Sequence, residues 1–298
     1  MEYTMSIDSV FHPDSQHLPR PTDLTLVSVD HVQFHVHRDR VVTSSSNCFG
    51  RLLLFQVHTP LALTEPSSVV SLVLHLIYQI PFQSQPPATT ILASFGAFQK
   101  YGLPSKQYLC QDSSLFNAIL AHIPSEPHDF AMEIFIVASQ NDLIDLAAPA
   151  STALLSYSPM SMDTAKARRI HPLYLKSLYD LHLKRIKALQ QIMIASPPSH
   201  PETQACGVEG RQHFLTFWNI QVSQIVLSAA AGKLILFFVN NPLIHIMHSD
   251  TTSELIRSTL LTIKPSLACD DCKMVLEAAI RNIIEKWEET EVIFSIII

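Results

Sequence analysis

Four residues in the last third of the chain have the types and spacing of a metal site. Cys269 and Cys272 form a C-x-x-C pair, and Cys206 lies in a preceding proline-rich segment, six residues after His200. Thiolates and a neutral imidazole are ligands that zinc takes in four-coordinate structural sites. The pattern therefore predicts a zinc site that would staple this part of the chain without an open position for catalysis.

Other interpretations of these cysteines remain open. His213, seven residues after Cys206, is a second candidate for the imidazole ligand, and the thiols would also suit ordinary buried positions. A redox role would need the C-x-x-C to open a helix after a strand in a βαβ setting. The sequence around Cys269 shows no such setting, so we do not expect redox chemistry there.

Two further histidine pairs have metal-clip spacing. His35 and His37 lie two apart on an expected strand, where both side chains would project to the same side. No third ligand follows nearby, so we interpret His37 as the end of the strand, hydrogen-bonded locally, and His35 as a packed or solvent-facing residue. His245 and His248, three apart, receive the same interpretation.

Catalytic and cofactor-binding motifs are missing from the sequence. The six glycines form neither G-x-G-x-x-G nor a P-loop, and there is no G-x-S-x-G elbow and no H-E-x-x-H. We therefore predict a protein that is not an enzyme, with no catalytic residues and no cofactor beyond structural zinc.

Charge and composition narrow the class of partner and the compartment. The 298 residues carry a net charge of -6 without a long Lys or Arg run, so direct nucleic-acid binding is not expected. The start of the chain lacks a signal peptide, and five unevenly spaced cysteines favour an intracellular protein of the cytoplasm or nucleus. The apolar stretch 225–247 is broken by Lys233 and by Asn240–Pro242, which favours two buried helices over a membrane span.

The elements that would position these residues change in type along the chain. Strand and helix patterns alternate first, and helical patterns follow alone, which predicts an α+β fold with a short mixed sheet and an all-α extension. The expected early elements are a flexible arm (1–22), a hairpin (24–36), short helices (41–53), a strand (61–64), a helix with serine caps (67–80) and another helix (91–103). The expected helical part comprises a helix pair joined near Asn141, a long helix over 171–194, a linker (196–204) and a last helix from 269. The predicted boundaries are 1–22, 23–124, 125–195 and 196–298.

The order of these elements resembles a BTB/POZ domain. A hairpin that ends in F-x-V-H-R is followed by an apolar residue, a serine-rich turn, a phenylalanine and a leucine pair; the matching residues are Phe34, Val36, His37, Arg38, Val41, Ser46, Phe49, Leu52 and Leu53. The segments VVSLVLHLIYQIPF and FGAFQKYGLP continue the family's order. The later segments YLKSLYDLHLKRIKAL, HPETQAC and CDDCKMVL are similar to the BTB proteins of mushroom-forming fungi, so the likeness covers residues 23–290.

The resemblance implies protein–protein interaction, with His37 as a structural residue of the hairpin-to-helix junction. Members of the family self-associate, and some are substrate adaptors of cullin ubiquitin ligases or transcriptional regulators. We therefore expect a protein-interaction module, which could also self-associate into a homodimer. An adaptor that binds a cullin and a zinc-stabilised nuclear scaffold are the alternatives. The family's adaptors often carry a hydrophobic-x-Glu signature in the loop that here reads FQVHTP, without an acid, whereas Leu63-Thr64-Glu65 falls after the strand.

Overall fold

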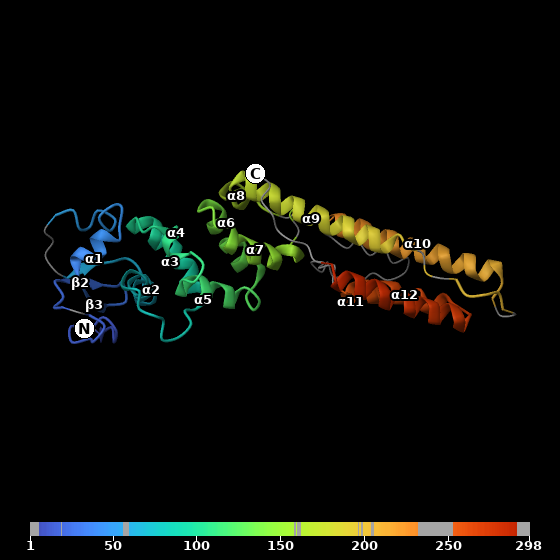
Figure 1. The fold of residues 1–298 in the computed structure, drawn as a ribbon, viewed down its shortest axis with the longest axis horizontal. Coiled ribbons are helices and arrows are strands. Elements are labelled where there is room, and N and C mark those ends of the chain that lie inside the picture. The colour runs from blue at the N-terminus through green and yellow to red at the C-terminus, as the bar shows by residue number, and fades with distance from the viewer. Residues whose placement is uncertain are drawn as a thin grey trace. The chain divides into compact units, whose positions relative to one another are not determined.

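The chain forms two compact units, Met1–Ala153 and Leu154–Ile298 (Figure 1). The structure is a computed structural model, and it describes residues 6–18, 20–55, 60–157, 159, 162–195, 197, 199–203, 206–231 and 253–290. This division differs from the expected boundaries after residues 124 and 195. Residues 125–153 complete the first unit, because the helix over 128–140 is apolar on most of its surface and is buried there.

A four-stranded mixed sheet begins the first unit. Its strands are β1 (Ser6–Ile7), β2 (Leu24–Val27), β3 (Val32–Val36) and β4 (Leu61–Ala62), in the order β1-β3-β2-β4. β2 and β3 form the predicted antiparallel hairpin, in which Leu26 lies opposite Phe34 and both side chains are fully buried. β4 pairs in parallel with β2, as β1 does with β3. The alternation of apolar residues thus predicted the hairpin correctly, and the short apolar segment at 61–64 predicted β4.

The segment before β2 is built into this sheet, which differs from the flexible arm expected over residues 1–22. β1 pairs with β3, and the Phe11 carbonyl accepts a hydrogen bond of 2.8 Å from the His35 N–H. The Phe11 side chain is completely buried, with its ring edge-on to the rings of His75 and Tyr78. A few apolar residues within a polar segment are enough to fix it, because burial of one phenylalanine contributes about 2–3 kcal/mol.

Within its described residues, the first unit also contains seven helices: α1 (Arg38–Thr43), α2 (Ser67–Tyr78), α3 (Ala88–Tyr101), α4 (Ser105–Tyr108), α5 (Ser114–His122), α6 (His128–Gln140) and α7 (Ile144–Ala153). α2 packs against α3, and α6 packs against both α7 and α3. The predicted helices near 67–80 and 91–103 and the helix pair joined near Asn141 are confirmed. Of the residues matched to the BTB pattern, Phe34, Val36, Phe49 and Leu53 are buried, whereas Leu52 is partly exposed.

The start of α2 is capped from a distant turn rather than by the expected serine. Pro66 is the N-cap residue and makes no side-chain cap hydrogen bond. Instead, the Asp30 carboxylate in the β2–β3 turn accepts hydrogen bonds from the Ser67 N–H at 2.8 Å and from the Ser67 hydroxyl at 2.6 Å. These bonds, with one from Ser28, outweigh the effect of burial and hold the pKa of Asp30 below its usual value. The hairpin therefore fixes where α2 begins.

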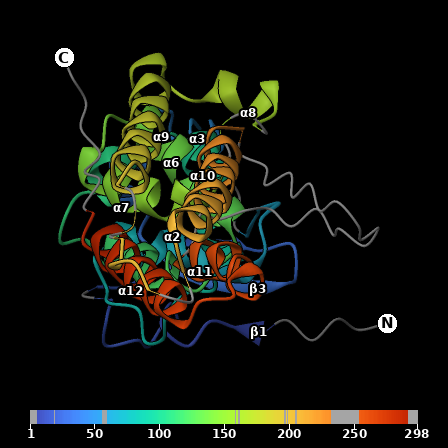
Figure 2. The same cartoon turned by 90° about the vertical axis from the view of Figure 1, so that its right-hand side faces the viewer.

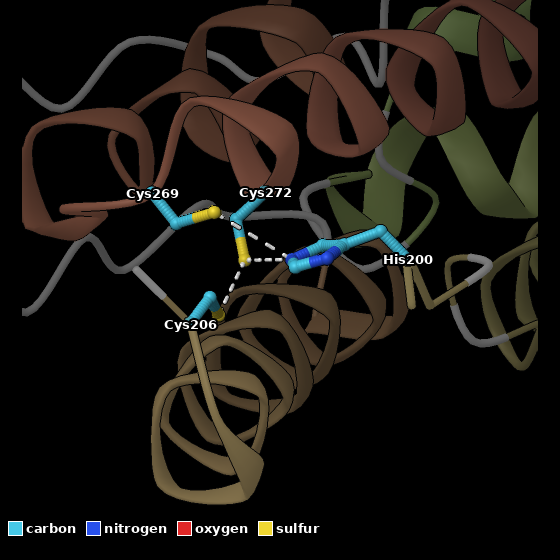
Figure 3. A group of neighbouring side chains, drawn as sticks. All are labelled: His200, Cys206, Cys269 and Cys272. Carbon is cyan, nitrogen blue, oxygen red and sulfur yellow. Dashed lines mark hydrogen bonds between the residues drawn. The ribbon is translucent and has the colours of Figure 1, made fainter. Parts of the chain in front are cut away.

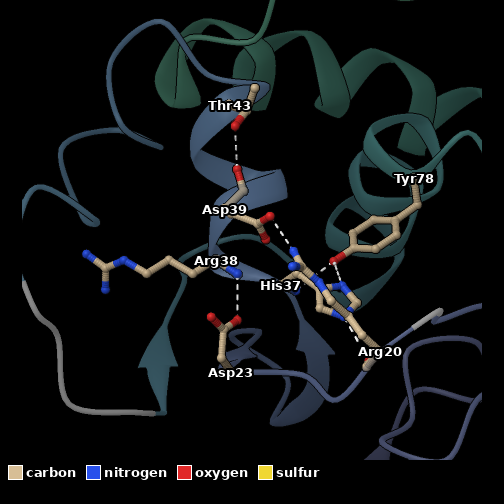
Figure 4. Close-up of polar contacts among 7 residues, drawn as sticks. All are labelled: Arg20, Asp23, His37, Arg38, Asp39, Thr43 and Tyr78. Atoms are coloured by element: carbon tan, nitrogen blue, oxygen red, sulfur yellow. Dashed lines mark hydrogen bonds and ion pairs between the residues drawn. The ribbon is translucent and has the colours of Figure 1, made fainter.

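His37 is a buried structural residue (Figure 4). Its Nε2 lies 2.9 Å from the Arg20 carbonyl oxygen, which can only accept, so Nε2 carries the proton and donates. Its Nδ1 then accepts from the Tyr78 hydroxyl at 2.9 Å, and its backbone N–H donates to the same oxygen at 2.7 Å. With both ring nitrogens engaged, His37 has no free ligand atom. His35 contacts Thr25 instead, so the pair forms no metal clip, as interpreted from the sequence.

The second unit contains five α-helices in its described residues: α8 (Thr164–Arg169), α9 (Pro172–Met193), α10 (Val208–Ala231), α11 (Ser253–Leu261) and α12 (Asp270–Glu288). Two short 3₁₀ turns, Leu154–Ser156 and Lys264–Ser266, accompany them. α9 packs against α10 and α12, and α11 packs against the same two helices (Figure 2). Trp218, Ile256, Leu260 and Leu276 are among the side chains buried between them.

The predicted long helix over 171–194 and the last helix from 269 are confirmed. On the expected apolar face of α9, Leu178, Leu189 and Met193 are buried, whereas Leu175, His182 and Ile186 are only partly so. The two helices expected over 225–247 lie largely outside the described residues, as do His245 and His248. In the described part of the chain, none of the helices is long and apolar enough to cross a membrane.

Replacing Tyr78 with phenylalanine tests the structural role of His37. Tyr78→Phe leaves two buried polar atoms of His37 without partners, which costs about 1–3 kcal/mol. We expect faster hydrogen exchange of the β2–β3 amides, which reports on the first unit alone. The matched control is Tyr179→Phe, whose partly exposed hydroxyl makes one hydrogen bond, to Pro159. Equal exchange in Tyr78→Phe and the unsubstituted chain would contradict this role.

Candidate metal centre

Three cysteines and one histidine converge inside the second unit (Figure 3). The ligand atoms of His200, Cys206, Cys269 and Cys272 all lie within 4.8 Å of one another. The cysteines are at most 6% exposed, whereas His200 as a whole residue is half-buried, with its ring turned toward the sulfurs. These are the four residues that the sequence pattern predicts.

The spacing of these atoms fits a tetrahedron around one ion. Bond lengths for zinc of about 2.3 Å to sulfur and about 2.0 Å to nitrogen give edges of about 3.8 Å between two sulfurs and about 3.5 Å between sulfur and nitrogen. The Cys206 and Cys272 sulfurs are 3.6 Å apart. His200 Nε2 lies 3.1 Å from the Cys272 sulfur and 3.7 Å from that of Cys269. The sulfurs are free thiols, too far apart for a disulfide bond.

The His200 ring is held in the tautomer that a metal ligand needs. Its Nδ1 lies 2.7 Å from the Pro201 carbonyl oxygen, an acceptor only, so Nδ1 carries the proton. The lone pair is then on Nε2, the atom that faces the sulfurs. A backbone carbonyl that orients a ligating histidine in this way is usual at zinc sites.

Backbone hydrogen bonds and a close approach to α10 place Cys206. Its N–H and carbonyl pair with those of Thr203, at 3.1 and 3.2 Å, which closes a tight turn just before α10. An ion pair between Glu202 and Arg211 ties the same segment to the first turn of the helix. A Cβ at Gly210 would lie 3.0 Å from the Cys206 sulfur, so the absence of a side chain there gives the thiol its room.

The start of α12 places the other two sulfurs. Cys269 is the N-cap residue, and Cys272 follows in the first turn. The N–H of Cys272, helped by that of Asp271, lowers the pKa of the Cys269 thiol. Burial, and next the neighbouring Cys206, raise the pKa of Cys272 to about 12. Three buried sulfurs this close resist joint ionisation, and a cation at their centre would remove that conflict.

The structure resolves one alternative and adds residues that the pattern did not indicate. His213, the other candidate ligand, is exposed on α10, with its ring against Phe217. Pro201, Thr203 and Gly210 were missed as supports of the site. The sequence shows that the segment is proline-rich and that a glycine lies near Cys206. It does not show the direction of the Pro201 carbonyl or the distance from Gly210 to the Cys206 sulfur, on which their roles depend.

Comparison with family models, with curated proteins and with solved structures gives no match to this chain. The BTB/POZ resemblance therefore stays a prediction. The geometry of the residues themselves supports the metal centre.

Substituting Gly210 tests whether the Cys206 sulfur is held by an ion. Gly210→Ala favours the helix by up to about 1 kcal/mol, and a free thiol can turn away from the new methyl group. A metal-bound sulfur cannot move, so we expect zinc affinity to fall by about tenfold, measured by competition with a chelator.

Gly207→Ala is the matched control, since a Cβ there meets nothing within 4 Å. Equal zinc affinities in the two variants would show that the Cys206 sulfur is not fixed by the ion.

Proposed function

We propose that the chain is a non-enzymatic protein-interaction scaffold whose second unit is closed by a structural zinc ion. The observation that carries the proposal is the convergence of four buried or half-buried ligand atoms within 4.8 Å. Three thiolates and one imidazole fill all four positions of a tetrahedral zinc ion. Catalytic zinc keeps one position for water or substrate, which this ligand set would not leave.

The ion would join segments that are far apart in the chain. His200 and Cys206 belong to the connection between α9 and α10, whereas Cys269 and Cys272 belong to the start of α12. Cys206 and Cys272 are 66 residues apart, and His200 and Cys272 are 72 apart. Zinc would therefore fix where α12 begins against the first turn of α10, and its binding energy would add to the folding energy of this unit.

The interaction role rests on the BTB/POZ resemblance together with the absence of catalytic motifs from the sequence. In the first unit, the consecutive residues Leu54 and Phe55 are 51% and 80% exposed, which is compatible with a protein-binding surface there.

The adaptor alternative has less support from the same unit. Glu65, the acid of the Leu63-Thr64-Glu65 sequence, accepts a hydrogen bond from the Tyr101 hydroxyl and pairs with Lys100 at 2.7 Å. Its side chain is only 14% exposed. A carboxylate engaged in this way is poorly placed to contact a cullin. The nuclear-scaffold alternative is compatible with zinc and differs from our proposal in compartment and partners.

Removing the metal tests the proposal. We expect one zinc per chain after metal-supplemented expression, and loss of the ion in Cys272→Ser or after chelation. Stabilisation by a ligand at about a thousand times its Kd is about 4 kcal/mol. Accordingly, we expect the melting temperature of the second unit, measured by circular dichroism, to fall by about 10 °C when zinc is lost.

Cys110→Ser is the control, because Cys110 is an exposed free thiol of the first unit. A zinc-free chain that melts no lower than the zinc-loaded chain would contradict the structural role. For the interaction role, an affinity pull-down of the zinc-loaded, tagged chain from its native cells separates the candidates. Retention of the chain's own untagged copies or of non-cullin proteins supports the scaffold, and recovery of a cullin supports the adaptor.

A further inference from the structure

A basic stretch in the second unit stands out against the acidic chain. Residues 163–187 carry seven Lys or Arg and two Asp, whereas the whole chain has a net charge of -6. The stretch comprises α8, the turn after it and most of α9. Its exposed basic side chains are Arg168, Arg169, Lys176, Lys184 and Lys187. Such a local excess attracts an acidic partner and repels a basic one.

A shallow, open apolar groove of about 510 Å³ lies in the middle of this stretch. Ala167, Ile170, Leu175 and Tyr179 are among its lining residues, and Arg168 and Lys176 supply the charges at its border. The Tyr179 hydroxyl donates to the Pro159 carbonyl oxygen at 3.2 Å, which fixes one wall. One turn further along α9, Leu183 is 53% exposed and continues the apolar line.

We propose that this groove binds an acidic amphipathic helix of a partner protein. Leu175, Tyr179 and Leu183 are four residues apart, so they form a ridge about 12 Å long on one side of α9. A helix with apolar residues at matching intervals packs against such a ridge, as helices do in recognition grooves. Acidic residues beside its apolar stripe then meet Arg168 and Lys176.

Both basic side chains can be reached by a partner. Lys176 pairs with Asp180 at 3.1 Å, but the two side chains are 64% and 39% exposed. An exposed pair of this kind contributes little to stability because water screens it, so an incoming carboxylate competes with it easily. The inference rests on the proposed interaction role and names its partner class, but it does not depend on the zinc ion.

A protein helix fits this site better than a lipid surface. Anionic membranes bind a convex apolar face that is flanked by cations, whereas these apolar residues line a shallow groove. A groove of this size accommodates two or three side chains of a helix.

Fluorescence anisotropy with a designed peptide tests the proposal on the full zinc-loaded chain. The probe is a labelled helix of about 18 residues, or five turns, with leucines spaced for one apolar stripe and glutamates beside it. We expect the double variant Arg168→Glu/Lys176→Glu to weaken binding by about tenfold or more. Leu183→Ser should weaken it with no change in charge. The matched control is Lys106→Glu, an exposed reversal in the first unit that should leave the affinity unchanged.

Other occupants give other results, each of which would overturn the proposal. Equal binding of a peptide with lysines in place of glutamates would remove the charge argument. Binding to phosphatidylserine vesicles but not to the peptide would indicate a lipid surface. Binding that appears only after truncation behind Thr290 would identify residues 291–298 as the occupant. Concentration-dependent dimerisation that the double variant abolishes, without peptide binding, would indicate a second copy of the chain. Zinc content, measured in the same samples, separates these outcomes from a failure of the zinc proposal.

Discussion

The arrangement of the second unit depends on one buried point, where three sulfurs and an imidazole nitrogen face one another. Polar atoms withdrawn from water need partners, and these four have chiefly each other. Three local features bring these atoms together: the backbone pairing of Thr203 with Cys206, the missing side chain at Gly210, and the start of α12. A zinc ion at their centre would allow the three sulfurs to ionise together and would join all four ligands at one point.

The first unit is held by different means. Its sheet and helices surround an apolar core, and a few long-range hydrogen bonds fix their register. Tyr78 holds the junction after β3 through His37, and Asp30 sets the start of α2 through Ser67. His37, whose spacing from His35 in the sequence is that of a metal clip, thus serves a structural purpose.

Patterns of neighbouring residues in the sequence predicted most helices and strands. The features that they did not predict depend on contacts between residues far apart in the chain. Apolar residues alternate with polar ones around Phe34, and they recur at helical spacing along α9. Both patterns involve only nearby residues, so the sequence alone predicts the hairpin and the helix. Phe11 lies in a segment without periodicity, and only its burial beside His75 and Tyr78 reveals that the segment belongs to the fold. For the metal site, the C-x-x-C spacing identified two ligands. The pattern also indicated His200, and the fold excludes the alternative His213, which is exposed on α10 although it lies at a similar distance from Cys206 along the chain.

The proposed zinc site is closed, with three sulfur ligands and one nitrogen ligand. X-ray absorption at the zinc edge of the purified, zinc-loaded chain would measure this ligand set. We expect a shell of three sulfurs at about 2.3 Å and one nitrogen at about 2.0 Å, with no bound water. A shell dominated by oxygen or nitrogen, or one with an exchangeable water in the fourth position, would contradict it.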